Sequence, residues 1–327
     1  MKSTLAAVLA TSALALATPA AAQSSPPPVA GCDRACLIAL ADTYAQALID
    51  DEPDAVRWAR NAVVMENLAR SRPGEGAFDT ITGEGTDSYA VHVADPVSGQ
   101  VGLLTMMAEG DAPVLVGIRL KLDASGAVEE AEHLIARNLS DAQLANLQSP
   151  RTQLLIPVPA AYADSRARLI WLGTSYYDAL DLNNSRFSNM ADDCVRHENG
   201  FQTARNSFTR PGVVFSDSEF AYLGGLGCAA QIDTNMWEYI DTIENRRVEI
   251  ADEVTGLVWG VSHFHHAMDK DYTPLIGVPW FESRDMRRFN AFDMPAIHIY
   301  KVWGGAIHEI EALGIVMPYQ SPHAFAR

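Results

Sequence analysis

"YAQALIDDEPDAVRWARNAVVMEN" (residues 44–67) has a related second copy later in the chain. "YYDALDLNNSRFSNMADDCVRHEN" (residues 176–199) aligns with it without a gap, at a constant offset of 132 residues (176 against 44). Two later segments repeat in the same order: "DPVSGQV" (95–101) matches "DEVTGLV" (252–258), and "GAVEEAE" (126–132) matches "GAIHEIE" (305–311). Three collinear matches at domain-length spacing predict an internal duplication.

Each half has the same sequence of local patterns. In the first half, apolar residues at helical spacing predict a helix over 36–48 with Asp33 as its N-cap. The run 50–53 ends that helix, and we expect a short second helix to about Arg60. Extended segments follow, separated by turns such as "PVSG" and "DASG". The second half repeats this plan after a helix over 167–180. The expected fold class is α+β, with helices packed on a curved antiparallel sheet, present twice.

The N-terminus has the features of a secretory signal. Lys2 precedes an apolar run over 5–16, and three alanines precede Gln23. The run is too short for a permanent transmembrane anchor. We therefore expect cleavage near Ala22 and a periplasmic or secreted protein. The expected organisation is a signal peptide (1–22), a flexible leader (23–31), a first repeat (32–150) and a second repeat (151–327).

The charge balance and the cysteines narrow the function classes. A net charge of −17 argues against nucleic acid and anionic membrane surfaces as partners, because both require a basic footprint. No phosphate-binding glycine loop and no GxSxG motif occurs in the sequence. Four cysteines in an oxidising compartment allow three disulfide connectivities. We favour Cys32–Cys36 with Cys194–Cys228, because each pair is close in sequence and each half then has its own bridge.

The halves differ in polarity along equivalent segments. "QVGLLTMMAEG" (100–110) is almost wholly apolar, whereas "LVWGVSHFHHAMD" (257–269) contains three histidines. The run "AVVM" (62–65) likewise becomes "CVRH" (194–197). The second half also gains His298, Tyr300 and His308. We therefore expect the functional site in the second half.

The "HFHH" stretch (263–266) allows three interpretations. In a strand, His263 and His265 point to one face and His266 to the other, so one face could present a neutral imidazole as a base. Two histidines at i and i+2 with Asp269 nearby could instead bind a metal. The third interpretation is an exposed strand end. We give equal weight to the interpretations as a proton-transfer base and as an exposed strand end, and less weight to a metal site.

The charged stretch "ADDCVRHENG" (191–200) contains residues that both halves share and residues that only the second half has. Glu198 and Asn199 recur in both halves, which indicates a scaffold role. Arg196 and His197 point in opposite directions in an extended segment, so only one can enter a pocket. Asp193 is then the better acid–base partner. The insertion 201–245 is longer than its counterpart, and residues 206–228 are expected to cover the mouth of the second sheet.

These features resemble a known superfamily. The long N-terminal helix, a short helix ending in "MADDCVRHENG" and the hairpin "YKVWGGAIHEIEAL" are similar to the NTF2-like, SnoaL-type α+β cone. With "CDRACL", "ENG", "DEVTGLV", "FHHA" and "MPY", the chain more narrowly resembles a largely uncharacterised exported two-repeat family of fungi and bacteria. The resemblance implies an apolar pocket and cofactor-free proton transfer, as in ketosteroid isomerase, scytalone dehydratase and polyketide cyclases. "FHHA" favours His266.

Three functions follow as hypotheses. The first is a lyase, dehydratase or isomerase that transfers a proton on a hydrophobic, aromatic or polyketide-like small molecule, with no cofactor and no metal. The second is an exported carrier of such a ligand. The third is a dimerisation module, in which the first half replaces a partner subunit as a pseudo-dimer within one chain. The expected catalytic residues are His266, His265, Asp193 and Tyr177. The expected substrate-binding residues are Arg196, His197, Trp259, His263, His298 and Tyr300.

Overall fold

A computed structural model describes residues 28–85, 88–206 and 218–323 of the chain. The expected signal peptide and most of the leader lie outside these residues. The leader's last residues, Val29–Gly31, form a 3-10 turn, and the Val29 N–H donates to the Pro96 carbonyl at 2.8 Å. The described end of the leader is therefore joined to the first half by a backbone hydrogen bond. None of the described helices is both long and apolar enough to cross a membrane.

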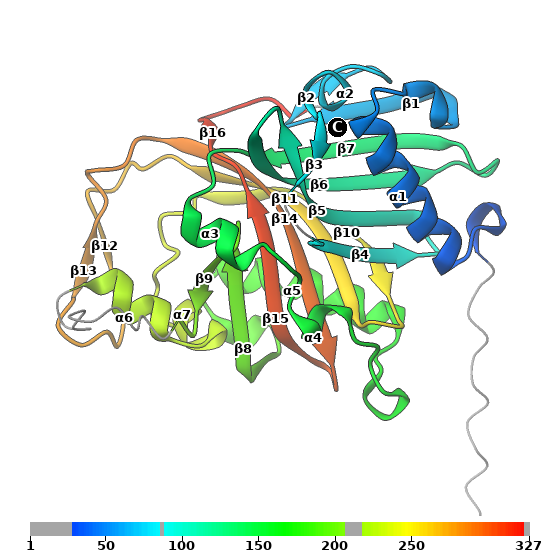
Figure 1. Cartoon of the computed structure of the whole chain (residues 1–327). Coiled ribbons are helices and arrows are strands. Elements are labelled where there is room, and N and C mark those ends of the chain that lie inside the picture. The colour runs from blue at the N-terminus through cyan, green and yellow to red at the C-terminus, as the bar shows by residue number, and fades with distance from the viewer. Residues whose placement is uncertain (1–27, 86–87, 207–217, 324–327) are drawn as a thin grey trace, which may run out of the picture.

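A seven-stranded sheet forms the first half (Figure 1). Its strand order is β2-β1-β7-β6-β5-β3, with β4 also paired to β5. All these pairings are antiparallel except that of β1 with β7, which is parallel. The strands are β1 (Trp58–Glu66), β2 (Ala69–Ser71), β3 (Gly83–Glu84), β4 (Ala90–Asp95), β5 (Gln100–Glu109), β6 (Ala112–Leu122) and β7 (Val128–Ala136).

The second half contains the corresponding sheet. Its order is β10-β11-β14-β15-β8-β9, with β16 paired to β14, and its one parallel pairing joins β8 to β15. A separate two-stranded sheet joins β12 to β13. The strands are β8 (Met190–Glu198), β9 (Phe201–Ala204), β10 (Thr242–Asp252), β11 (Leu257–His266), β12 (Tyr272–Pro274), β13 (Ser283–Asp285), β14 (Phe292–Trp303), β15 (Ala306–Gly314) and β16 (Met317–Pro318).

One long helix covers each seven-stranded sheet. The two long helices have the same length and lie at the sequence offset of the repeat. Asp33 caps the first, as expected, by accepting a hydrogen bond from the Cys36 N–H. The described helices are α1 (Arg34–Ile49), α2 (Ala77–Thr80), α3 (Asp141–Asn146), α4 (Thr152–Leu155), α5 (Arg166–Asp181), α6 (Glu219–Gly225) and α7 (Cys228–Ile232).

The same turn follows the parallel strand in both halves. Asn67 and Asn199 have φ of 45° and 48°, and each side-chain oxygen accepts a backbone N–H from the last strand of its half, at Ile135 and Gly314. Asn199 is therefore a scaffold residue, as the repeat comparison predicted. Equivalent strand order, equivalent parallel pairs and equivalent helices confirm the α+β fold with a duplicated helix-on-sheet unit.

The faces of the two sheets that are not covered by α1 and α5 pack against each other. Their shared core contains Leu104 and Leu115 from the first half and Trp259 and Ile297 from the second. Two ion pairs cross between the halves in a reciprocal arrangement. Arg34 at the start of α1 pairs with the buried Asp252, and Arg166 at the start of α5 pairs with the buried Asp95. The chain thus supplies both sides of a two-fold-like contact by itself.

We expect this contact between sheets to be sensitive to a single methyl group. A Cβ at Gly102 lies 2.4 Å from Trp259, whereas a Cβ at Gly83 meets nothing closer than 3.9 Å. Gly102→Ala should therefore lower the free energy of unfolding by about 1–3 kcal/mol, and Gly83→Ala by less than about 0.5 kcal/mol. Urea unfolding measures both, and equal values for the two variants contradict this packing.

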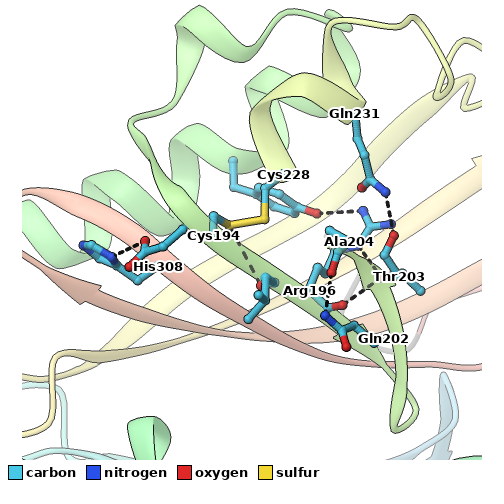
Figure 2. The surroundings of a disulfide bond; sticks show 11 residues. Cys194, Arg196, Gln202, Thr203, Ala204, Cys228, Gln231 and His308 are labelled. Atoms are coloured by element: carbon cyan, nitrogen blue, oxygen red, sulfur yellow. Dashed lines mark hydrogen bonds and ion pairs between the residues drawn. A yellow bond between two sulfur atoms is a disulfide. The ribbon is translucent and has the colours of Figure 1, made fainter. Parts of the chain in front are cut away.

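Both disulfides have the expected pairing. The Cys32–Cys36 disulfide lies at the N-terminal end of α1, and Cys194 on β8 is joined to Cys228 at the start of α7. The second bridge fixes the insertion to the second sheet, as Figure 2 shows. Residues 207–217 of the expected covering loop lie outside the described residues. The described part of the insertion forms α6, α7 and the segment that leads into β10.

Two expected local structures are wrong. The expected second helix to Arg60 is a single 3-10 turn at Pro53–Ala55, and Trp58 already lies in β1. The "MADDCVRHE" stretch, expected to end a short helix, is strand β8. In both halves the parallel neighbour supplies backbone hydrogen bonds to this segment. Because that neighbour lies more than 60 residues away in sequence, a local pattern cannot reveal the pairing.

Candidate functional site

Strand β11 distributes its histidines over two faces. Phe264 packs beneath α5, with its ring 6.3 Å from that of Tyr177, and His266 lies on the same face. His263 and His265 share the opposite face with Trp259, which faces the first half. His266 and His265, the two alternatives expected for the proton carrier, therefore lie on different faces of the sheet, since neighbouring strand residues point in opposite directions.

His266 is a buried core histidine. Its ring stacks on Phe292 at 4.1 Å and on Tyr239 at 5.5 Å. Burial lowers the pKa of His266 to about 4, so the ring is neutral near pH 7. Tyr239 lies against it and lines the pocket described below, whereas His266 does not. The assignment of His266 as a catalytic base is therefore not supported by its position.

Four further candidates lie away from the pocket. Asp193 is largely exposed and bonds His308 at 2.6 Å. His197 is buried on the outward face of β8, where burial and the nearby Arg151 lower its pKa to about 3. Trp259 is fully buried between the sheets, and His263 bonds Asp293 on the same face of β11. His197, Trp259 and His263 lie away from the pocket because they point away from α5, whereas Asp193 lies on an exposed, irregular part of β8.

A pocket of about 420 Å³ lies beside β8 and β9. Its volume is in the range of small-molecule sites in proteins. The insertion forms much of its wall, and α3, which follows the first sheet, contributes Gln143 together with the N-cap residue Ser140. The lining residues are Ser140, Gln143, Arg196, Glu198, Asn199, Phe201, Thr203, Phe220, Leu223, Gly224, Gln231, Met236, Trp237, Tyr239 and Arg284.

Arg196 is the buried cation of this pocket. Its Nε donates to the Thr203 hydroxyl at 2.7 Å, and its Nη1 donates to the Tyr176 hydroxyl at 3.3 Å (Figure 2). The guanidinium carbon lies 4.5 Å from the centre of the Trp237 ring. Arg196 is only 6% exposed, yet among the described residues no carboxylate forms an ion pair with it. Burial acts to lower the pKa of Arg196, but nearby groups, Tyr176 and Glu198 among them, outweigh it and raise the pKa, so the guanidinium stays charged. A buried cation that lacks an ion-pair partner is suited to binding an anion.

A neutral polar cluster lies behind Arg196. The Tyr177 hydroxyl and His298 Nδ1 form a hydrogen bond of 3.2 Å, and the His298 and Tyr300 rings stack. Burial raises the pKa of Tyr177 to about 12, and burial together with the charge of Arg196 lowers the pKa of His298 to about 3. Both groups are therefore neutral near pH 7. Tyr177, His298 and Tyr300 are brought together as a group, but they reach the pocket only through Tyr176 and Arg196.

Glu198, Tyr239 and Arg284 complete the polar wall. Glu198 lies two residues after Arg196 on the same face of β8. Arg284 on β13 pairs with Glu219 at 3.3 Å, and its guanidinium carbon lies 5.3 Å from the centre of the Tyr239 ring. Burial raises the pKa of Tyr239, against the opposing effect of Arg284, so its hydroxyl stays protonated. One carboxylate and two guanidinium groups thus face an aromatic pocket, which allows a proton acceptor and an anion site to act together.

Part of this wall was missed by the sequence analysis. Glu198 was assigned to the scaffold because it recurs as Glu66, but only Asn199 has that role. The difference between the halves that points to the pocket lies two residues before Glu198, where Val64 of the first half is replaced by Arg196. Arg284 and Phe220 lie in segments that the first half lacks, so a comparison of the two repeats could not identify them. The insertion carries Phe220, and its described part lines the pocket, whereas Arg284 comes from β13.

Comparisons with known proteins found one family profile and several solved structures with similarity to parts of the chain. A family profile described as a domain of unknown function (DUF8021) matches residues 162–314. No curated protein matches the chain. A steroid delta-isomerase from Pseudomonas aeruginosa is 14% identical, with a TM-score of 0.23, over 31% of this chain and 79% of its own. A candidate polyketide cyclase from Silicibacter sp. TM1040 is 12% identical, with a TM-score of 0.27, over 45% of this chain and 88% of its own. A candidate SnoaL-like isomerase from Agrobacterium tumefaciens C58 is 12% identical, with a TM-score of 0.23, over 31% and 97%.

Proposed function

We propose that the pocket of the second half binds a hydrophobic, aromatic small molecule that carries a carboxylate or an enolisable carbonyl. The observation that supports this most strongly is Arg196, a buried guanidinium held by two hydroxyls and an indole ring, with no ion-pair partner among the described residues. Phe201, Phe220 and Trp237 offer ring faces to a planar ligand. The first half has valine in place of Arg196 and no equivalent insertion.

We further propose that the bound molecule undergoes a proton transfer, as in an isomerase or lyase that needs no cofactor. The Glu198 carboxylate accepts a proton from the carbon next to the carbonyl group. The negative charge that develops on the carbonyl oxygen is stabilised by the guanidinium of Arg196. Return of the proton to another carbon of the same molecule completes an isomerisation, and loss of a leaving group from the enolate completes an elimination.

Glu198→Gln tests this role. Enolisable aromatic carbonyl compounds are incubated with the protein in D2O, and NMR follows the exchange of the C–H hydrogen for deuterium. We expect Glu198→Gln to lower the exchange rate by about 10²- to 10⁴-fold, because a positioned general base contributes about that much. Affinity for the same compounds should change by less than about 3-fold, since the amide keeps the shape of the carboxylate.

Glu66→Gln is the matched control, because Glu66 occupies the position of Glu198 in the first half. It should leave the exchange rate unchanged. Exchange that persists at the wild-type rate in Glu198→Gln contradicts the assignment of this carboxylate as the base.

A carrier function is the second candidate. It is favoured by one observation: neither His266 nor His298, the buried imidazoles under α5, is among the residues that line the pocket. A carrier binds aromatic carboxylates through Arg196 and catalyses no exchange in D2O. Two disulfides fit a protein of an oxidising compartment, so we propose that either activity takes place outside the cytoplasm, after removal of residues 1–22.

A further inference from the structure

Two histidines and a carboxylate meet on the face of the second sheet that is turned towards the first half, on the other side of β11 from α5. His263 and His265 lie two residues apart on β11, and their ring centres are 4.2 Å apart. Asp293 lies directly opposite His265 on β14. One carboxylate oxygen is 3.1 Å from His263 Nε2, and the other is 2.9 Å from His265 Nδ1.

We propose that His263, His265 and Asp293 bind one divalent transition-metal ion of the Zn²⁺ type. The three donor atoms, one from each residue, all lie within 4.8 Å of one another. Zinc bonds of about 2.0–2.2 Å to imidazole nitrogen and carboxylate oxygen require donor separations of roughly 3–4 Å, so a small closure of the group is sufficient. Two imidazoles and one carboxylate are a ligand set that Zn²⁺ accepts, with further positions left for water.

The surroundings of these residues fit such an ion. Asp293 is fully buried and also accepts the Ser321 N–H at 2.8 Å, which fixes the carboxylate. Glu244 Oε2 lies 3.6 Å from His265 Nε2, the ring nitrogen that does not face Asp293. A carboxylate at the outer nitrogen of a ligating histidine orients the ring and raises its basicity. The His265 side chain is 17% exposed, which gives an ion a way in from solvent.

The sequence indicated Asp269 as the carboxylate of a possible metal site at "HFHH", but Asp269 is exposed and not part of this group. The carboxylate comes instead from β14, a pairing that only the sheet reveals. This site is separate from the pocket and does not depend on the proposed function.

The test is a calorimetric titration of ZnCl₂ into chelator-treated full-length protein that carries no histidine tag. We expect one Zn²⁺ per chain, and a thermal unfolding midpoint that rises with Zn²⁺. His265→Ala and Asp293→Asn should each weaken binding by more than about 100-fold, and Glu244→Gln by about 10-fold, as is usual for outer-sphere partners. Elemental analysis after dialysis gives an independent stoichiometry.

His308→Ala is the matched control, because His308 also bonds an aspartate but has no second histidine beside it. Its affinity for Zn²⁺ should equal that of the wild type. If Asp293→Asn fails to fold, His265→Ala decides alone, since its ring is partly exposed. Absence of saturable Zn²⁺ binding by the folded wild type overturns the proposal, and so does wild-type affinity in His265→Ala.

Discussion

Arg196→Met is expected to weaken the binding of aromatic carboxylates, such as naphthoate or cinnamate, by about 10- to 100-fold. A hydrogen bond to a charged group contributes about 1.5–3 kcal/mol, and 1.4 kcal/mol corresponds to a factor of ten in affinity. Methionine keeps much of the side-chain volume and its contact with Trp237 but removes the cation. Isothermal titration calorimetry measures the loss, and the corresponding neutral amides should bind the two proteins about equally.

Arg168→Met is the matched control for this variant. The Arg168 guanidinium also lies over an indole ring, 4.2 Å from the centre of Trp171, but it is at the start of α5 and does not line the pocket. Its ligand affinity should stay at the wild-type value. The stability of Arg196→Met should change little, because the two lost hydrogen bonds are offset by removal of a buried unpaired charge. Undiminished carboxylate affinity in a folded Arg196→Met protein contradicts the assignment.

Glu132→Gln is expected to have the largest effect on stability. Glu132 on β7 is 2% exposed and bonds Arg119 of its own half at 2.9 Å and Arg247 of the second half at 2.6 Å. Arg119 keeps its ion pair with Glu130, but loss of a shared carboxylate from a buried ion-pair network costs about 3–5 kcal/mol. Urea unfolding at pH 7 measures the change. Glu129→Gln, on the same strand but one-third exposed, should change stability by less than about 1 kcal/mol.

The same carboxylate predicts a pH dependence. Burial alone raises the pKa of Glu132, but Arg247 and Arg119 outweigh it and lower the pKa from 4.5 to about 2. The stabilisation is therefore fully present above pH 4.5 and is lost as the pH falls towards 2, a change of about 3 kcal/mol. Glu132→Gln should lack this part of the acid dependence. An identical loss of stability between pH 4.5 and pH 2 in wild type and variant contradicts the linkage.

The duplication could be predicted because both copies retain the same residues at the positions that shape the backbone. Asn67 and Asn199 hold the same turn, and α1 and α5 begin and end at equivalent residues. The strands β1 and β8 could not be predicted from the sequence, because each pairs with a parallel strand far along the chain. A charged segment such as "ADDC" has no apolar alternation that could show the pairing on its own.

The site could be assigned to one half but not to the correct residues. Histidine is enriched in the second half, but strand alternation turns His263 and His265 towards the first half, and Phe292 stacks on His266 in the core. Arg196, expected from the sequence as a substrate-binding residue because the first half has valine at its position, lines the pocket. Glu198 and Arg284 depend on the insertion folding back over β8, and the contacts that place it there are tertiary.

A crystal structure of the protein with a bound aromatic carboxylate tests the central claim most directly. The claim is that the second half alone carries the ligand pocket and that Arg196 anchors the ligand. We expect the carboxylate about 2.7–2.9 Å from the Arg196 guanidinium, with the aromatic ring against Trp237. A ligand bound in the first half, or one bound in the second half with its carboxylate away from Arg196, contradicts the account.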